Sequence, residues 1–410
     1  MARNDQFMVG LDLGSTKTCA LVCQRGKEGK LRVAGLGLAE SKGWRKSLIV
    51  NLDLTVLAVK KAVEAAETAA GISITSAYVG VGGTHIKGLN SRGAVALGKA
   101  PDATATITQE DILRVLHASR PETLPADREI VYMESQDFVL DAHEGIRNPV
   151  GMSGARLEAN VHLITASSIA VRNVITAANM AGIKVLDTVY EPFAAAGACL
   201  TADDRELGVA LADVGGGSTD LIVYAEGAIR HTASIPVGGD HFTNDIAVGL
   251  RTTIPEAEKV KVSWGEHQAD SNPDACVEVN GAGERPTRVV SYTLLDDIIR
   301  PRILDLVELI RDELDRCGLR GQLGAGVVLV GGGAKLGGLL PVAEQTLEVQ
   351  VRLGQCTGFE DKGESPLGPE FATAVGLVAY ANRRRLLRDA QEKGTVARIL
   401  DFLRGKGDGV

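Results

Sequence analysis

The chain has 410 residues, enough for about two to four folding units, and its 52 acidic and 44 basic residues give a net charge of -8. This charge excludes a general nucleic-acid-binding protein, whose surface must neutralise phosphates, but it is compatible with a local basic patch. The fractions of hydrophobic (45%) and charged (23%) residues are typical of a soluble globular protein.

The first predicted elements are a β-hairpin, a helix and a further strand. Apolar segments separated by turns predict them at residues 7–13, 18–24, 54–70 and 77–81. The turn between the first two strands reads Asp12-Leu13-Gly14-Ser15-Thr16-Lys17. The helix should end at Gly71, because a left-handed residue is favoured there.

The pattern changes at residue 84. Residues 84–162 combine short apolar segments with one clear helix, which begins at Thr108 and has Asp111 three residues later, a variant of the capping box. Short strands are predicted at 94–97, 130–132 and 138–140. We interpret this segment as an inserted subdomain, because the order of helices and strands resumes afterwards, at 168–181, 185–189 and 193–200.

The opening hairpin returns in the second half of the chain. Asp213 lies 201 positions after Asp12, with an apolar strand before it, three glycines after it and then a second apolar strand. Such self-similarity indicates two related halves that face one another. A helix follows over 294–316, in which Pro301 should cause a kink or a break. A buried strand at 327–330 then leads into a third glycine-rich turn.

Glycine-rich turns after buried strands indicate a phosphate site. A triphosphate needs several backbone N–H donors at close range, and a side chain would obstruct that approach. Two hairpins can hold it from both sides, while an aspartate at the start of each turn can hold hydrated Mg²⁺. One hairpin alone would be weak evidence, since glycine hairpins are common. The chain lacks the GxxxxGKS or GxxxxGKT motif of P-loop proteins and the GxGxxG motif of dinucleotide sites.

These features together resemble the actin/hexokinase/DnaK-type ATPase superfamily. The phosphate hairpins, adenosine turn and connecting helices of that superfamily correspond to residues 12–22, 213–224, 327–339, 191–200 and 371–380. Segments 144–158 and 236–247 are most similar to the FtsA family, the bacterial actin relatives of the cell-division ring. The resemblance covers about residues 6–380. It implies an α/β, actin-like two-lobed ATPase fold with duplicated mixed-sheet halves and an FtsA-type inserted subdomain.

The resemblance also implies a site for ATP and Mg²⁺. The first phosphate loop would be Asp12, Gly14, Ser15, Thr16 and Lys17, and the second Gly215, Gly216, Gly217, Ser218 and Thr219. Asp12 and Asp213 would lie beside the metal, and the catalytic residues would be Glu191, which orients water or metal, and Asp213. The other cofactor contacts would be Gly238, Gly239, Glu258, Lys261, Gly331, Gly332, Gly333 and Ala334. No strongly tuned general base is evident, so slow or regulatory hydrolysis is expected.

The family plan divides the chain into subdomains. Subdomain 1A comprises 1–83, 163–199 and about 365–382, and subdomain 1C (84–162) is inserted in it. Subdomain 2A comprises 200–235 and 305–364, and subdomain 2B (236–304) is inserted in it. A linker at 383–394 and an amphipathic membrane-targeting tail at 395–410 follow.

The tail has the pattern of an amphipathic helix. Its apolar stripe consists of Val396, Ile399, Leu400 and Leu403, with Phe402 at the edge. Periodicity alone fits a helix packed on its own domain, whereas the positive local charge and the resemblance favour an anchor to an anionic membrane. The sequence has no signal peptide and no run of roughly 18 apolar residues. The expected location is therefore the cytoplasmic side of the cell membrane, at the division site.

The resemblance implies further partners: other copies of the chain in a filament, other division proteins, and the acidic C-terminal tail of FtsZ. Four arginines in subdomain 2B either pair with that tail or are ordinary surface charge: Arg285, Arg288, Arg300 and Arg302. The run Arg383-Arg384-Arg385 is interpreted as a solvated helix face or membrane-proximal charge. Trp44 and Trp264 are interpreted as packing residues. No nucleic acid is expected.

The FtsA hypothesis predicts an ATP-binding division protein that polymerises and tethers the FtsZ ring to the membrane. A scaffold of the pilus-assembly or rod-shape type and a small-molecule kinase are the alternatives within the superfamily. A kinase needs an aspartate base facing a substrate pocket, which the sequence does not reveal. A DnaK-type chaperone would require a long β-rich domain after the ATPase, and the chain is too short for one.

Overall fold

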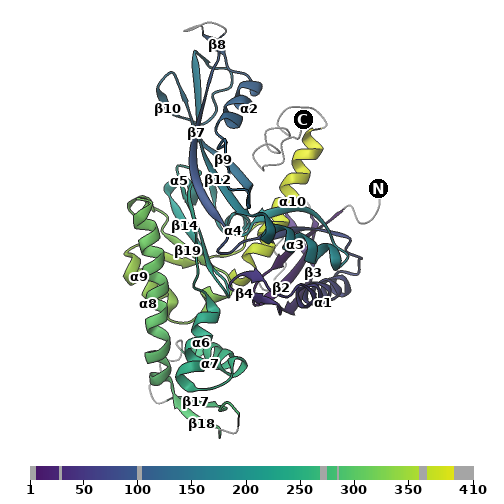
Figure 1. Ribbon diagram of the computed structural model, residues 1–410, viewed down its shortest axis with the longest axis vertical. Helices are drawn as coiled ribbons and strands as arrows, with labels where there is room; N and C mark the ends of the chain where they lie inside the picture. The colour runs from purple at the N-terminus through teal and green to yellow at the C-terminus, as the bar shows by residue number, and fades with distance from the viewer. Residues whose placement is uncertain are drawn as a thin grey trace.

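The computed structural model describes residues 6–26, 30–98, 104–267, 275–283, 286–359 and 367–391. They form two lobes, each built on a five-stranded mixed sheet, and a four-stranded sheet that extends from one end of the molecule (Figure 1). The predicted duplication of mixed-sheet halves is confirmed, because both five-stranded sheets have the same strand order and the same strand directions.

The first lobe has the strand order β13-β6-β1-β2-β3. The predicted hairpin pairs β1 (Phe7–Leu13) antiparallel with β2 (Lys17–Arg25), and β1 lies parallel to β6 (Ser76–Val81). The other elements of this lobe are β3 (Leu31–Glu40), β13 (Lys184–Tyr190), α1 (Leu52–Ala70), α3 (Ser168–Met180), α4 (Glu191–Cys199) and α10 (Ala372–Gln391). Gly35 and Gly37 let α1 lie directly on β3, because a Cβ on either would collide with backbone atoms of Ala62 or Ala66.

The second lobe has the order β16-β15-β14-β19-β20. Its hairpin pairs β14 (Val209–Val214) antiparallel with β15 (Thr219–Ala225), and β14 lies parallel to β19 (Val327–Val330). The remaining elements are β16 (Ala228–Ile235), β20 (Val351–Leu353), α5 (Ala202–Leu207), α6 (Gly239–Leu250), α7 (Ile254–His267), β17 (Cys276–Val279), β18 (Arg288–Ser291), α8 (Tyr292–Arg316) and α9 (Leu339–Leu347).

The four-stranded sheet, in the order β10-β9-β12-β7, has its own small hydrophobic core with one helix. Its elements are β7 (Lys87–Ala96), α2 (Gln109–Ala118), β9 (Arg128–Leu140), β10 (His143–Ile146) and β12 (Arg156–Ser167), with the short pair β8 (Ala105–Thr106) and β11 (Ser153–Gly154) beside them. The capping box of Thr108 and Asp111 is present at the start of α2. The segments predicted as strands at 130–132 and 138–140 are both strand, but the break between them is wrong, because β9 is one continuous strand. The polar residues between them still pair with β12, and Asn160 donates to Asp137 at 2.6 Å.

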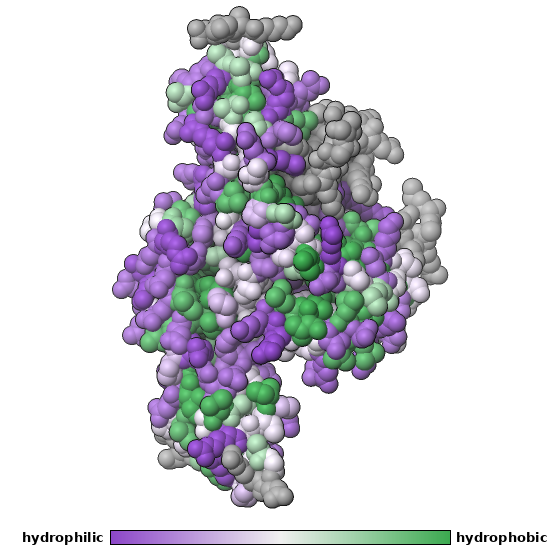
Figure 2. Space-filling view, viewed as in Figure 1, coloured by the Kyte–Doolittle hydropathy of each residue, from purple (hydrophilic) through white to green (hydrophobic). Residues whose placement is uncertain are grey.

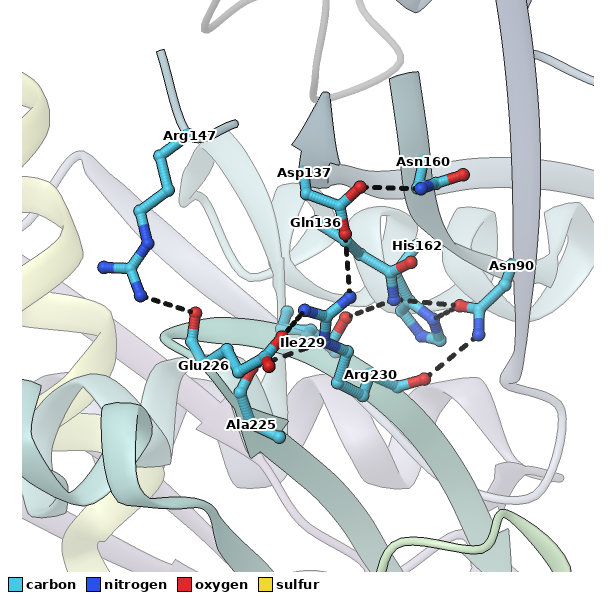
Figure 3. A network of polar contacts seen from close by, with 10 residues as sticks. All are labelled: Asn90, Gln136, Asp137, Arg147, Asn160, His162, Ala225, Glu226, Ile229 and Arg230. Carbon is cyan, nitrogen blue, oxygen red and sulfur yellow. Dashed lines mark hydrogen bonds and ion pairs between the residues drawn. The ribbon is translucent and has the colours of Figure 1, made fainter. Parts of the chain in front are cut away.

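A polar interface joins this sheet to β16 of the second lobe (Figure 3). The Asn90 side-chain amide donates to the Arg230 carbonyl at 3.2 Å, and the Arg230 guanidinium pairs with Asp137 at 3.2 Å. Behind them, His162 Nε2 lies 2.9 Å from Thr232 Oγ1. Burial lowers the pKa of His162 to about 3, so its ring is neutral in this contact at pH 7. Directional hydrogen bonds therefore set how the two sheets meet.

Two helices differ from the sequence prediction. Of the kink or break predicted at Pro301, the break is wrong: α8 is continuous, and Ile299 and Ile303 on either side of the proline are fully buried in one core. The same helix crosses the 304/305 boundary predicted between subdomains 2B and 2A. The predicted linker at 383–394 begins inside α10, which continues to Gln391. Arg384 is 14% exposed and lies 3.6 Å from the buried Asp187, so this part of the arginine run packs on the lobe.

The surface carries hydrophobic residues in separate small groups among hydrophilic ones on the face shown in Figure 2. No helix in the described part of the chain is both long enough and apolar enough to span a bilayer. The tail stripe, Val396 to Leu403, lies outside the described residues.

Candidate functional site

A cavity of about 760 Å³ is lined by residues of both lobes. Its walls are the turns at 12–17, 80–83, 215–218 and 331–333, together with residues of α6, α7 and the start of α10. The hairpins that the sequence singled out thus meet across one space, as two related halves facing each other would require. Three of the residues predicted to bind the cofactor are absent from its lining: Thr219, Gly238 and Ala334.

The turn of the first hairpin brings side chains to the cavity. Asp12, the last but one residue of β1, lines the cavity, and so do Gly14, Ser15, Thr16 and Lys17 after it. The Lys17 ammonium donates to the Glu370 carbonyl at 2.6 Å and lies 4.3 Å from the centre of the Phe371 ring. Burial raises the pKa of both Asp12 and Asp213, and the positive charge of Lys17 offsets part of that rise at each of them.

The turn of the second hairpin brings backbone. Gly215, Gly216 and Gly217 line the cavity, and the Gly217 N–H donates to Ser15 Oγ at 3.0 Å. A Cβ on Gly216 would collide with Thr16 Oγ1 of the first hairpin. The Thr219 hydroxyl is buried and donates to the Val237 carbonyl at 2.8 Å, so it holds the strand end rather than facing the cavity.

Four carboxylates line the cavity: Asp220 is buried, and Asp12, Glu191 and Asp213 are partly buried. Burial raises the pKa of Asp12 to about 6 and that of Asp220 to about 7. Burial also raises the pKa of Asp213 and, further, that of Glu191, and the negative charge of Asp12 adds to the shift at Glu191. Such mutual repulsion is relieved by a cation, so this carboxylate set fits a positively charged group.

The same carboxylates do not form a closed metal cage. Among the described residues, no group of three His, Cys, Asp or Glu side chains is placed to hold a metal ion. Mg²⁺ keeps several waters and commonly shares oxygen ligands with phosphates, so it needs only one or two carboxylates nearby. Asp213 accepts a hydrogen bond from the Thr373 hydroxyl at 3.0 Å, which keeps its carboxylate oriented. The site therefore fits a hydrated Mg²⁺ that arrives with a phosphate ligand.

The third glycine turn also lies in the cavity wall, next to Asp213. Gly331, Gly332 and Gly333 line the cavity, while Ala334 is buried behind them. Gly331 has a φ of 84°, and a Cβ there would collide with the Asp213 carboxylate. Glycine is therefore required at this position both by conformation and by space.

The predicted pair on α7 also faces the cavity. Lys261 Nζ lies 2.7 Å from Glu258 Oε2, donates to Thr243 at 3.0 Å and to the Gly239 carbonyl at 3.3 Å. Gly239 lines the cavity, whereas Gly238 packs against the carbonyls of the second hairpin turn. Gly239 therefore borders the ligand space, whereas Gly238 supports the hairpin turn.

Several cavity residues were missed by the sequence analysis. Asp220 accepts hydrogen bonds from the Gly83 N–H at 3.2 Å and from the Ser218 hydroxyl at 3.3 Å. Lys335 pairs with Glu370 at 2.9 Å. Trp44, which was expected only to pack, also lines the cavity. One sequence signal could have pointed to this part of the wall: β6 is a buried strand followed by Gly82 and Gly83, the same pattern as in the glycine-rich turns that were predicted.

The predicted arginines of residues 236–304 have partners within the chain, so far as they are described. Arg302 pairs with Asp245 at 2.7 Å and with Asp305 at 3.2 Å, and Arg300 pairs with Asp296 at 3.2 Å. Arg288 donates to the Leu250 carbonyl. Arg285 lies outside the described residues. Arg300 and Arg302 already pair with carboxylates of the chain, whereas Arg288 contacts a carbonyl, so an acidic ligand would meet least competition at Arg288.

Comparisons with known proteins agree on one family. A family model described as "Cell division protein FtsA" matches residues 210–376, and one described as "SHS2 domain inserted in FTSA" matches residues 83–165. The cell division protein FtsA of Pseudomonas aeruginosa is 38% identical to the chain, over 93% of this chain and 91% of that protein.

Two solved structures share the fold at low sequence identity. The PilM–PilN type IV pilus biogenesis complex matches with a TM-score of 0.62 and 19% identity, over 92% of this chain and 98% of that one. MreB5 of Spiroplasma citri bound to ADP matches with a TM-score of 0.54 and 14% identity, over 95% and 99%. These likenesses confirm the actin-like fold.

Proposed function

The chain belongs to the FtsA family of actin-like cell division proteins, and we propose that it binds ATP with Mg²⁺ in the cavity between its two halves. The observation that carries this proposal is the meeting of two glycine hairpins beside these carboxylates. Backbone N–H groups of the second hairpin turn and hydroxyls of the first would bind the phosphates. The MreB5 structure that shares the fold is described as bound to ADP, which supports a nucleotide as the ligand.

Each group of residues has a defined task in this proposal. Asp12 and Asp213 hold the water ligands of Mg²⁺, which supplies positive charge to the phosphate oxygens. Gly331 to Gly333 flank the adenosine, with Glu258 and Lys261 on the other side of it. Glu191 orients a water at the phosphate end. Because burial raises the pKa of Glu191 well above its usual range, its carboxyl keeps a proton to higher pH when no cation is near. The neutral acid cannot accept a proton from water, so we expect slow hydrolysis.

For the cell, we infer a protein that polymerises and tethers the FtsZ ring to the cytoplasmic membrane. The subdomain division 1A, 1C, 2A and 2B, with α8 shared between 2A and 2B, is part of this proposal. Subdomain 2B, with Arg288 and Arg300 exposed on it, would receive the acidic FtsZ tail. The apolar stripe at Val396 to Leu403 would insert into an anionic membrane, and polymerisation would add avidity.

Calorimetry with the full chain tests the nucleotide site. Wild-type protein should bind ATP in the presence of Mg²⁺, and Asp213→Ala should abolish binding without unfolding the protein. Asp297→Asn, an exposed carboxylate on α8, is the matched control and should bind normally. Equal ATP affinity in the wild type and Asp213→Ala would overturn the proposed site.

Co-sedimentation tests the tether. The wild-type chain with ATP should pellet with anionic vesicles and should carry FtsZ into the pellet. Leu400→Glu should release it from vesicles while ATP binding persists, and reversal of charge at Arg288 and Arg300 should release only FtsZ. Full vesicle binding by Leu400→Glu, or unchanged FtsZ in the pellet after charge reversal, would contradict the respective assignment.

A further inference from the structure

A strained hairpin turn lies in the wall of the cavity. The strands β4 (Trp44–Arg45) and β5 (Leu48–Ile49) pair antiparallel and leave Lys46 and Ser47 as a two-residue turn. Both turn residues have positive φ angles, 50° and 59°. A two-residue turn of this kind normally uses glycine or asparagine, and other residues are strained in a left-handed conformation. Such strain persists only where surrounding contacts enforce it, which makes the contacts of this turn informative.

The tip of the turn reaches the second phosphate hairpin. Ser47 is 9% exposed and its hydroxyl donates to Ser218 Oγ at 3.0 Å. A Cβ on Gly217 would lie 2.7 Å from Ser47 Oγ, and a Cβ on Gly83 would lie 2.7 Å from Ser47 Cβ. Ser47 of the first lobe therefore occupies space that is kept open by glycines of both lobes.

A buried carboxylate holds this contact in place. The Ser218 hydroxyl donates onward to Asp220 at 3.3 Å, and Asp220 also accepts the Gly83 N–H at 3.2 Å. Gly217 also brings the first hairpin close, because its N–H donates to Ser15 Oγ, and both Ser15 Oγ and Ser47 Oγ lie beside it. Ser47 thus stands beside both phosphate hairpins and next to Gly83 in the cavity wall.

We propose that the Ser47 hydroxyl binds the terminal phosphate of a nucleoside triphosphate and couples the presence of that phosphate to the 44–49 hairpin. This inference rests on the proposed nucleotide site and adds a discrimination between triphosphate and diphosphate. A hydroxyl and a turn N–H are donors suited to phosphate oxygens. A diphosphate has no group at that end of the cavity, so it leaves the Ser47–Ser218 contact unchanged.

Equilibrium binding of a non-hydrolysable ATP analogue and of ADP, each with Mg²⁺, tests the discrimination in the full chain. Ser47→Ala and Ser47→Gly both remove the hydroxyl, but only the glycine variant also relieves the strain. In both variants, the triphosphate should bind about fivefold more weakly, as expected for one hydrogen bond, while ADP affinity changes less than about twofold. Lys46→Gly relieves strain in the same turn, keeps the hydroxyl and should preserve the wild-type ratio of the two affinities.

Tryptophan fluorescence gives a second readout that needs no Ser47 variant to fold. The chain has two tryptophans; Trp44 lies in the hairpin, and Trp264 is fully buried beside Asp296. The triphosphate analogue should change the emission, ADP should not, and Trp44→Phe should remove the change. Equal weakening of ATP analogue and ADP in the Ser47 variants, or equal emission changes with both ligands, would overturn the inference. Failure of the wild type to bind either ligand would instead overturn the nucleotide site, and the inference with it.

Discussion

The two hairpins that meet in the cavity share a strand plan but differ in what their turns present. The first turn brings side chains, namely Ser15, Thr16 and Lys17, and has one glycine. The second brings three consecutive glycines, and its Ser218 is buried beneath the turn, 5% exposed. The duplication therefore preserved the backbone architecture while the chemistry of the two turns diverged.

The difference follows from how closely the turns approach each other. A Cβ on Gly216 would collide with Thr16, and one on Gly217 would crowd the hydroxyls of Ser47 and Ser15. Only one of two facing turns can carry side chains at this distance, so the other must be bare backbone. Adding a side chain to the second turn should therefore reduce ATP affinity more than removing one from the first turn.

The largest effect is expected from Gly216→Val. A branched side chain would force the two hairpins apart and fill the phosphate space, so ATP affinity should fall by more than about a hundredfold. Calorimetry measures the affinity, and circular dichroism checks the fold. Gly197→Ala is a suitable control, because a Cβ at this exposed position of α4 has nothing within 4 Å. Normal ATP binding by Gly216→Val would show that the second turn need not be bare.

A pH series should separate the aspartates that begin the two turns. Burial raises the pKa of Asp12 from 3.8 to about 6, so between these values the folded protein holds a proton that the unfolded chain has lost. The contribution of Asp12 to stability therefore falls as pH rises from about 4 to about 6, and the loss is complete above that window. Without nucleotide, Asp12→Asn should then melt at a higher temperature than the wild type at pH 7.5, with a smaller difference at pH 4.5.

Binding should show the opposite preference. Mg²⁺ needs the ionised carboxylate, so wild-type affinity for Mg-ATP should decrease as pH falls below about 6. Asp12→Asn should weaken binding about thirtyfold at pH 7.5, within the range for lost carboxylates around metals. Asp297→Asn serves as the control in both series. If Asp12→Asn lowered the melting temperature at pH 7.5, the ionised Asp12 carboxylate would stabilise the fold, contrary to the destabilisation by burial inferred from its raised pKa.

A smaller effect is expected at the support of the second aspartate. The Thr373 hydroxyl, at the start of α10, donates to Asp213 at 3.0 Å and offsets part of the rise in the pKa of Asp213 that burial causes. Thr373→Val has nearly the same shape but removes the donor, so Asp213 should protonate more easily and Mg-ATP affinity should fall about tenfold at pH 7. Thr373→Ser keeps the hydroxyl and should retain most of the affinity. Identical losses in both variants would point to packing rather than to the hydrogen bond.

The sequence was sufficient for features that are encoded locally. Apolar strands that end in Asp-x-Gly predicted both hairpins and their duplication, and Thr108 with Asp111 predicted the start of α2. Ser47 left no such signal, because its contact with Ser218 spans 171 positions and its turn lacks the usual glycine or asparagine. Pro301 misled for a related reason, since burial along α8 outweighed a local helix breaker. In both cases the outcome depends on contacts between residues far apart in the sequence, which local sequence patterns do not contain.

The smallest effect should come from a deletion in the first turn. The Ser15 hydroxyl accepts the Gly217 N–H at 3.0 Å, and it can donate its own proton to a phosphate oxygen at the same time. Ser15→Ala removes that donor and leaves space rather than a collision, so ATP affinity should fall about fivefold, far less than in Gly216→Val.

The sign of the Ser15→Ala effect decides how the two turns share the ligand. If a phosphate displaced Ser15 from Gly217, the wild-type hydroxyl would compete with ATP, and the alanine variant would bind more tightly. Calorimetry at one pH distinguishes the two cases, with Ser153→Ala at an exposed position of the four-stranded-sheet region as the control. Weaker binding supports a first turn that contributes side-chain donors beside bare backbone, whereas tighter binding would mean that the first turn covers the second until ATP arrives.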